Sequence, residues 1–535
     1  MSRLERVSQT KAQARSAPDR SRSRSLARRR RRLGRGLAWV VALVGAGALL
    51  VAAGIYVLYT RADTTNVGEL SLRKELRIPP LAEPTLSQPG RKVFDLTLEV
   101  GRTELLPGKL TETWGANGTY LAPTLRAARG NEVLVNVENG LAGETTTLHW
   151  HGMHLPAAAD GGPHQTIEPG ETWSPAWTID QPAATLWYHP HPHGATEDHV
   201  YRGIVGMFIL DDLNTAQLGL PDEYGVDDIP LIVQDKRFED DGSLDFTKGM
   251  ISPTGLLGDE ILVNGTHDPY LEVSTELVRL RLLNASNARV YNIGFADARP
   301  FQLIATDGGL LEAPVRLDRI QLSPGERAEM VAQFEPGEEV VLRSFEPELG
   351  TNFFEGRFSG ADDSFDLLEI RAAGELASSP QLPARLAAIE SPDEADASGV
   401  RRFELSGQSL INGQEMDMTR IDQAVELGAT EIWEVENRSG TPHSFHIHDV
   451  RFRVLEYAGA EPPPQLAGLK DTVYVPPNES VRLLTEFSNY ADPGLPYMFH
   501  CHILQHEDRG MMGQFAVAGR PGGQTVDHAD HPLGH

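Results

Sequence analysis

Cysteine is almost absent from this sequence of 535 residues, in which Cys501 is the only one. An internal disulfide is therefore excluded. Methionine is also scarce, with ten residues that form no cluster, and long amphipathic helical patterns are few. The 51 glycines, the 36 prolines and short alternating apolar runs such as residues 132–137 instead predict a turn-rich, mostly β protein.

An excess of positive charge is missing after residue 35. Residues 1–35 carry thirteen Lys and Arg against Glu5 and Asp19, a net charge of +11, so the total of −27 leaves −38 for residues 36–535. Nucleic-acid binding needs a basic surface. The acidic body therefore argues against a nucleic-acid partner.

Charge of either sign is missing from residues 36–60. This run is long enough for a helix that crosses a bilayer, and the arginines before it should stay in the cytoplasm. We expect a basic cytoplasmic segment (1–35), a transmembrane signal anchor (36–60) and an exported body. The alternatives are a cleaved export signal, with a cleavage site near Ala52-Ala53-Gly54 or twin-arginine character, and a buried core helix.

The exported part is long enough to predict several domains, and its composition indicates where they begin and end. Proline-rich residues 61–91 and residues 376–399 are expected linkers. Between and after them we predict three β-sandwich domains and a tail, over residues 92–215, 228–375, 400–518 and 519–535. The histidines of the tail are expected to be solvated, with loose metal binding as the alternative.

The single cysteine lies in a stretch that is rich in metal ligands. Cys501 stands between His500 and His502, with His506 and Met511 beyond. A thiolate, two imidazoles and a weak axial thioether are the ligands of a blue-copper centre. Cys501, His506 and Met511 supply three of these ligands, and the candidate for the other imidazole is His443, upstream in the same domain. The alternatives are Met512 as the axial group and a simple buried cysteine.

Four His-x-His pairs share one spacing. On a strand, residues i and i+2 project from the same face, so each pair offers two imidazoles in one direction, and Cys501 faces away from its two neighbours. Eight imidazoles suit a cluster of three metal ions where the first and third domains meet. The second domain has only His267 and no cysteine, so we expect it to bind no copper and to act as a bridge. The pairs are His149/His151, His189/His191, His446/His448 and His500/His502.

These motifs resemble those of the multicopper oxidase family. Over residues 92–518 the chain is similar to bacterial copper-efflux oxidases and laccases, also in residues 234–238, 281–284, 305–309 and 470–473. The resemblance implies an all-β fold of three cupredoxin-like Greek-key sandwich domains, preceded here by the transmembrane helix. It also implies four copper ions, dioxygen and a small reducing substrate.

Ligand roles follow from the resemblance. His443, Cys501, His506 and axial Met511 would hold the type 1 copper, and His149 and His446 the type 2 copper. The two type 3 ions would be held by His151, His189 and His502, and by His191, His448 and His500. His193 lies beyond the motif and is expected near the ligands or at the surface.

Two carboxylates match positions at which the family relays protons to oxygen. They are Asp160, nine residues after His151, and Glu507, directly after His506. Reduction of dioxygen to water consumes four protons, so a dry cluster needs such groups. The alternatives are a turn residue for Asp160 and a plain loop carboxylate for Glu507.

The resemblance implies an oxidase. Together with the apolar run at residues 36–60, it places the expected enzyme in the bacterial inner membrane, with its catalytic domains in the periplasm, or in a secreted form after cleavage. It would couple one-electron oxidation of phenols, aromatic amines, Cu(I) or Fe(II) to four-electron reduction of dioxygen. Oxidation of Cu(I) would imply a role in copper homeostasis. Residues 439–442 replace the Met and Asp ligands that copper-efflux oxidases use for substrate copper, so phenols become as plausible as metal ions. The alternatives are a non-enzymatic periplasmic scaffold or copper carrier, and a two-domain nitrite reductase, which lacks this many histidine pairs.

Overall fold

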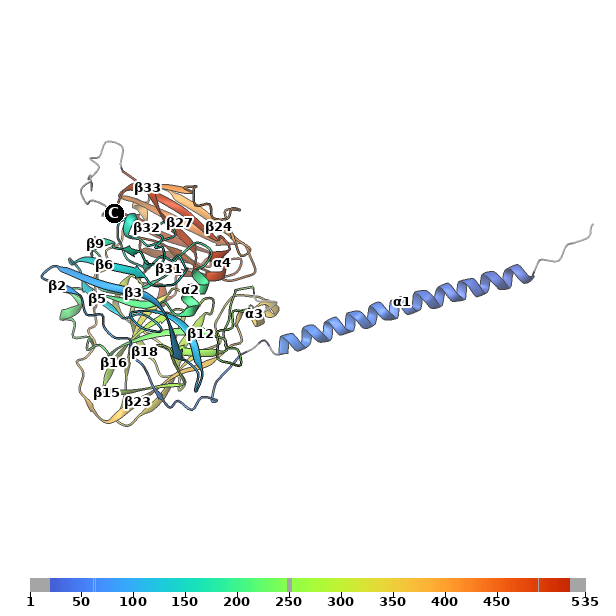
Figure 1. Cartoon of the computed structure of the whole chain (residues 1–535), viewed down its shortest axis with the longest axis horizontal. Coiled ribbons are helices and arrows are strands. Elements are labelled where there is room, and N and C mark those ends of the chain that lie inside the picture. Colours follow the sequence, from blue (N-terminus) through green and yellow to red (C-terminus); the bar gives the residue numbers. More distant parts are fainter. Residues whose placement is uncertain (1–19, 61, 63, 248–252, 489, 520–535) are drawn as a thin grey trace, which may run out of the picture. The chain divides into compact units, whose positions relative to one another are not determined.

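The computed structural model describes residues 20–60, 62, 64–247, 253–488 and 490–519. It forms two units, residues 1–62 and 63–535. Residues 1–19 of the basic segment and residues 520–535 of the tail, including its histidines, lie outside the described residues. The prediction of a mostly β chain is confirmed, because strands make up most of the second unit (Figure 1).

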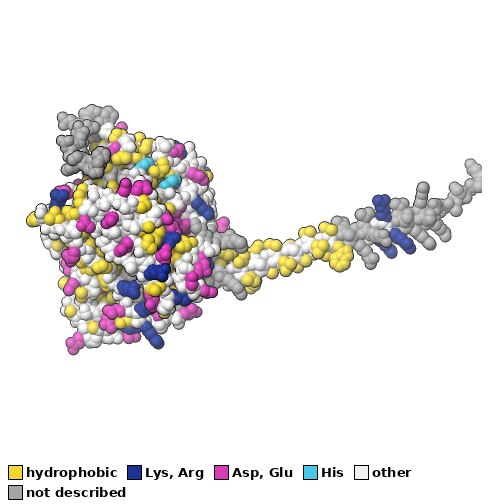
Figure 2. Space-filling model, viewed as in Figure 1, with side chains coloured by type: hydrophobic (Ala, Val, Ile, Leu, Met, Phe, Trp, Pro, Cys, Tyr) yellow, Lys and Arg dark blue, Asp and Glu magenta, His cyan; other side chains and the backbone are white. Residues whose placement is uncertain are grey.

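The first unit contains one long helix, α1 (Arg20–Thr60). Its stretch Trp39–Thr60 has a mean hydropathy of 2.4 and is exposed, which makes it a candidate membrane span (Figure 2). The helix begins well before the predicted start at residue 36. It includes part of the basic segment, because arginine is a good helix former and residues 20–38 contain no proline.

The second unit is built from sheets whose strands alternate as the sequence predicts. In β3 (Arg91–Glu104) the side chains of Phe94, Leu96 and Leu98 are buried, and the partner strand β6 (Glu132–Asn139) buries its valines in the same alternation. Apolar side chains at every second position put one face of a strand in the core.

Six sheets occur in the described part of the chain, and they pair around three hydrophobic clusters. The first pair consists of two sheets. One contains, in spatial order, β2 (Leu86–Gln88), β3, β6 and β8 (Thr172–Trp173), with β4 (Leu110–Ala116) paired to β3 and β9 (Ala176–Thr178) paired to β6. The other contains β5 (Leu125–Ala128), β11 (Gly206–Asp211), β10 (Ala184–His189) and β7 (His149–His151).

The second pair covers the middle of the chain. Its first sheet contains, in spatial order, β1 (Lys74–Glu75), β15 (Pro269–Thr275), β23 (Phe365–Ala377), β22 (Glu339–Phe345), β17 (Tyr291–Phe295) and β20 (Arg319–Leu322). Its second sheet contains β14 (Thr266–His267), β13 (Glu260–Val263), β12 (Asp228–Lys236), β16 (Leu277–Asn284), β21 (Arg327–Gln333), β18 (Phe301–Thr306) and β19 (Gly309–Leu317).

The third pair lies toward the C-terminus. Its sheets are β25 (Leu410–Ile411), β24 (Val400–Ser406), β27 (Ala429–Asn437), β32 (Ser480–Phe487), β29 (Phe452–Tyr457) and β30 (Leu469–Lys470), and β26 (Gln423–Glu426), β34 (Met512–Ala518), β33 (Asp492–Cys501), β28 (His443–Ile447) and β31 (Thr472–Val475).

Short helices connect the strands. They are α2 (Thr196–Arg202), α3 (Phe353–Ser359) and α4 (Leu504–Asp508), with 3₁₀ turns η1 (Ala157–Ala159), η2 (Thr215–Gln217), η3 (Glu394–Asp396) and η4 (Pro464–Leu466). Two of these helices, α2 and α4, pack against each other.

Both segments expected as linkers are attached to the body. In the first, β1 pairs with β15 and Leu76 is buried in the core of the second sheet pair. In the second, Leu386 is buried in the same core and its backbone N–H donates to Glu312 O at 2.9 Å. These segments differ from free tethers because their apolar side chains find a core to enter.

Candidate metal centre

Strand register sorts the ligands of the third sheet pair onto two faces. In antiparallel β28 and β33, Phe445 lies opposite Cys501 and His446 lies opposite His500. Directly opposed residues point to the same face, and neighbours alternate. His443 therefore shares a face with Cys501, whereas His446 shares the other face with His500.

The cysteine face forms a compact site. Cys501 Sγ lies 3.4 Å from His443 Nδ1 and 3.6 Å from His506 Nδ1, and the two nitrogens are 3.2 Å apart. All three side chains are fully buried. In both histidines the ring nitrogen that faces away from Cys501 is bonded to the protein. His443 Nε2 contacts Ser439 Oγ at 3.1 Å, and His506 Nε2 donates to Pro253 O at 3.0 Å.

Burial sets the charge of this site. It lowers the pKa of His443 well below its ordinary value and that of His506 to about 4, so both imidazoles are neutral at pH 7. It also raises the pKa of the Cys501 thiol to about 12. A bound cation reverses the thiol's preference, because a thiol that coordinates a metal loses its proton.

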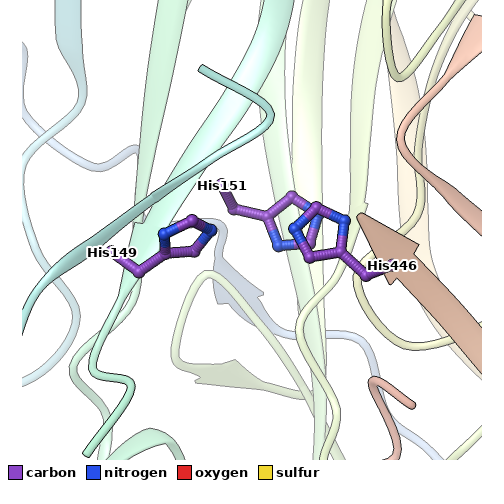
Figure 3. A group of neighbouring side chains, drawn as sticks. All are labelled: His149, His151 and His446. Carbon is purple, nitrogen blue, oxygen red and sulfur yellow. The ribbon is translucent and has the colours of Figure 1, made fainter. Parts of the chain in front are cut away.

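The opposite face meets the histidines of the first sheet pair. His149 lies opposite His189 in β7 and β10, so these imidazoles share a face. Three groups of neighbouring, fully buried ligand atoms result, each spanning no more than 4.8 Å: His149/His151/His446, His151/His189/His502 and His191/His448/His500. Figure 3 shows the first group, in which the rings of His151 and His446 stack at 3.7 Å.

Four of these imidazoles have one nitrogen bonded to an oxygen of the protein and the other without a hydrogen-bond partner among the described residues. The partnerless nitrogens are His149 Nε2, His151 Nδ1, His189 Nε2 and His446 Nε2. The bonded ones contact Asp160 O (2.8 Å), Asp471 Oδ1 (3.0 Å), Pro190 O (2.9 Å) and Asp471 O (2.8 Å), respectively.

This pattern fits metal ligation. Buried polar atoms are nearly always bonded, and a ligating histidine typically donates its other ring N–H to an oxygen of the protein. Burial lowers the pKa of each of these four imidazoles, that of His189 to about 3. The neutral form that a metal requires is therefore already present.

The two predicted carboxylates lie behind the histidines. Asp160 Oδ2 accepts from His448 Nδ1 at 2.8 Å, and Glu507 Oε2 lies 3.1 Å from His500 Nδ1, with Oε1 3.4 Å from His191 Nδ1. Burial raises the pKa of Asp160 well above its ordinary value. Each carboxylate thus contacts the nitrogen that faces away from the cluster.

The remaining predicted residues are the two methionines after His506 and the histidine beyond the His189/His191 pair. Met511 and Met512 are both buried, whereas His193 is exposed and in none of the groups of ligand atoms. The prediction missed the roles of Asp471 and Thr472, which both lie 3.0 Å from His151 Nε2. Their place in residues 470–473, one of the segments similar to bacterial laccases, was the available signal.

Comparison with known proteins identifies the family. Multicopper oxidase models match residues 98–215 and 380–520. Multicopper oxidase mco of Staphylococcus haemolyticus is 35% identical, over 85% of this chain and 97% of that protein. The chain belongs to the multicopper oxidase family. Copper is therefore the implied metal, and the donor set described above fits it.

Other relatives of this multicopper oxidase carry different names. Cell division protein FtsP of Xenorhabdus nematophila is 37% identical, over 83% of this chain and 92% of that protein. Among solved structures, a bacterial laccase-like multicopper oxidase, CueO from Ochrobactrum sp., has a TM-score of 0.75 and 36% identity, and covers 83% of this chain and 100% of its own. The predicted cupredoxin-like fold is confirmed by this similarity.

Proposed function

We propose that this multicopper oxidase is an enzyme that couples four one-electron oxidations of a small reducing substrate to the reduction of dioxygen to two waters. When bound, copper supplies the electron transfer and the dioxygen chemistry. One observation carries the proposal: Cys501 lies in the thiolate site, and its covalent neighbours His500 and His502 lie in two groups of the histidine cluster. A single tripeptide thus connects the two sites.

The proposed ligand assignment gives four coppers. His443, Cys501 and His506 would hold the type 1 ion, and His149 and His446 the type 2 ion. The type 3 ions would take His151, His189 and His502, and His191, His448 and His500. The groups of neighbouring ligand atoms support this division, because each set falls within one group.

Strand register favours Met511 over Met512 as the axial ligand. Met512 lies directly opposite His500 in β34 and β33, so its side chain shares the face of His500, which is turned away from Cys501. Met511 is the neighbouring residue and is buried in the same hydrophobic cluster as Cys501. We assign the thioether of Met511 to the type 1 site.

Asp160 and Glu507 are proposed to orient the ligands and to pass protons. A carboxylate that accepts from a histidine fixes the tautomer in which the opposite nitrogen can ligate. Four protons must reach the dry cluster in each turnover, and these two buried carboxylates contact its histidines.

The substrate would give up its electron at the outer side of His443. This imidazole is itself buried, with Ser439 against its outer nitrogen, so an electron must cross the cover formed by residues 439–442. The cover offers hydroxyl groups and no thioether, which fits phenols and aromatic amines at least as well as Cu(I) or Fe(II). The Ochrobactrum enzyme has oxidase activity towards lignin model compounds.

For localisation, we propose that α1 anchors the protein in the inner membrane of a bacterium, with the second unit on the periplasmic side. The apolar stretch Trp39–Thr60 and the preceding arginines support this orientation. Secretion after signal cleavage is the alternative, and the apparent mass of the mature membrane-bound chain distinguishes the two.

The second candidate function is that of a non-enzymatic scaffold or copper carrier of the cell envelope. It is favoured by the similarity to proteins named for cell division. The buried cluster of neutral imidazoles argues for the enzyme, because a scaffold has no need to keep so many ligands facing one another in the core.

The decisive test is the visible spectrum of copper-loaded protein that is reduced without oxygen and then exposed to air. The enzyme proposal expects a blue thiolate-to-copper band that bleaches and returns. A blue band that stays bleached would favour the carrier, and no blue band would favour the scaffold. A panel of phenols, Cu(I) and Fe(II) under aerobic turnover then identifies the substrate class.

A further inference from the structure

Arg327 is a fully buried cation at the start of β21, in the sheet pair that holds no predicted copper ligand. Its Nε donates to Thr185 O at 3.0 Å, and its terminal nitrogens donate to Asp471 Oδ1 at 2.7 Å and Oδ2 at 2.5 Å. Further bonds reach Gly325 O at 3.0 Å and Asp307 O at 3.2 Å. One guanidinium thus joins all three sheet pairs.

Asp471 connects this guanidinium to the histidine cluster. Its Oδ1 also accepts from the hydroxyl of Thr472 at 2.8 Å and from His151 Nε2 at 3.0 Å. A carboxylate can only accept, so Nε2 of His151 carries the hydrogen and Nδ1 keeps its lone pair. That lone pair faces the group formed with His189 and His502. The backbone oxygen of Asp471 likewise accepts from His446 Nδ1.

The turn that precedes Arg327 also touches the cluster. Gly325 has φ +88°, and a Cβ added there would lie 3.0 Å from the ring of His502. Ser323 Oγ contacts Ser444 Oγ at 2.8 Å, and the backbone oxygen of Ser444 accepts from the N–H of His502. Residues 323–327 therefore lie directly against His502, one ligand of the His151/His189/His502 group.

Surrounding charges hold the turn in place. Lys470 Nζ lies 2.8 Å from Asp307 Oδ2 and 3.0 Å from Glu326 Oε1, and Asp307 Oδ1 accepts from the backbone N–H of Arg327 at 2.7 Å. Every one of these side chains is buried. A buried charge is tolerated only with close partners, so removal of one partner disturbs the others.

We propose that the 323–327 turn, acting through Arg327 and Asp471, is a positioning device for the trinuclear copper site that fixes the orientation and tautomer of His151. Arg327 is a positioning residue, because it touches no copper ligand itself. The second sheet pair would then contribute to oxygen reduction and not only bridge its neighbours. The inference rests on the proposed function and extends it to residues outside the ligand motifs.

Arg281 provides a matched control in the same sheet. It is equally buried, bonds Asp228 at 2.6 and 2.9 Å and Glu329 at 2.9 Å, and reaches Thr185 Oγ1 at 2.7 Å. It therefore also connects the second sheet pair to β10, but its bonds lead to no histidine of the cluster. A purely structural role would make the two arginines equivalent.

The experiment compares wild type, Arg327→Met, Arg327→Lys and Arg281→Met in the full-length, copper-loaded protein. The readouts are copper per chain, the blue band, and its return in air after anaerobic reduction. We expect both Arg327 variants to keep the blue band, to bind less copper than Arg281→Met and to recolour at least about tenfold more slowly, as other outer-sphere changes do. Lysine should not rescue, because it cannot form the paired bonds to Asp471.

A second variant covers the case in which Arg327→Met does not fold. Thr472→Val keeps the side-chain shape and removes the hydroxyl that contacts His151 Nε2. It should lower copper content and recolouring in the same direction. Equal copper content and equal recolouring in the Arg327, Thr472 and Arg281 variants would overturn the inference. A wild type that fails to recolour would instead refute the proposed enzyme, while the copper contents still test the role of Arg327.

Discussion

Replacing Ser439 with alanine should raise the reduction potential of the type 1 copper. Nδ1 of His443 faces Cys501, so Nε2 carries the hydrogen and donates it to Ser439 Oγ. Oxidised copper draws more electron density from the ring and makes this N–H a stronger donor. The hydrogen bond therefore stabilises the oxidised site more than the reduced one, and its loss favours reduction.

The size of the shift follows from the strength of one hydrogen bond. A net contribution of about 1 kcal/mol corresponds to about 40 mV for a one-electron couple. This shift is the largest expected, and it applies if no water takes the place of the lost hydroxyl. Because His443 is fully buried, we expect no such water. The assay is a redox titration of Ser439→Ala followed at the blue band.

Thr441→Val is the matched control, because Thr441 Oγ1 contacts Ser439 Oγ at 2.9 Å and not the imidazole of His443. Its potential should stay within about 10 mV of wild type, well below the shift expected for one hydrogen bond. A Ser439→Ala potential that is unchanged or lower would refute the reasoning, and so would an equal rise in both variants.

Three further predictions concern other parts of the molecule. Met511→Leu should raise the type 1 potential and Met512→Leu should not, because the axial ligand tunes it; equal titration curves would contradict the assignment. Asp160→Asn should keep the blue band but slow its return in air about 100-fold, since the amide cannot pass protons; an unchanged rate would remove Asp160 from the proton path. Burial lowers the pKa of Lys236 to about 7. Between this value and the pKa of the lysine in the unfolded chain, the unfolded chain binds more protons than the folded chain. The free energy of unfolding therefore rises with pH, by up to about 1.4 kcal/mol per pH unit. Denaturant unfolding at about pH 7 and about pH 9 should show this slope in wild type and a smaller one in Lys236→Met; equal slopes would contradict it.

Much of the site could be anticipated because its ligands lie on strands with a period of two. The spacing of His500, Cys501 and His502 alone placed the thiol on one face and the imidazoles on the other, and the groups of ligand atoms follow that division. The apolar run and the alternating strands likewise indicated the candidate membrane span and the mostly β body. The start of α1 differed, because helix propensity continues beyond the apolar boundary.

The sequence by itself determined which residue types could bind copper and which face of a strand each would occupy, since both depend on chemistry and local geometry. Only the tertiary structure decided what stands behind the ligands. His151 and Asp471 are 320 positions apart, and Arg327 reaches Asp471 across 144 positions. No local pattern marks such pairs, because they form where separate sheets pack together and bury their charges against one another.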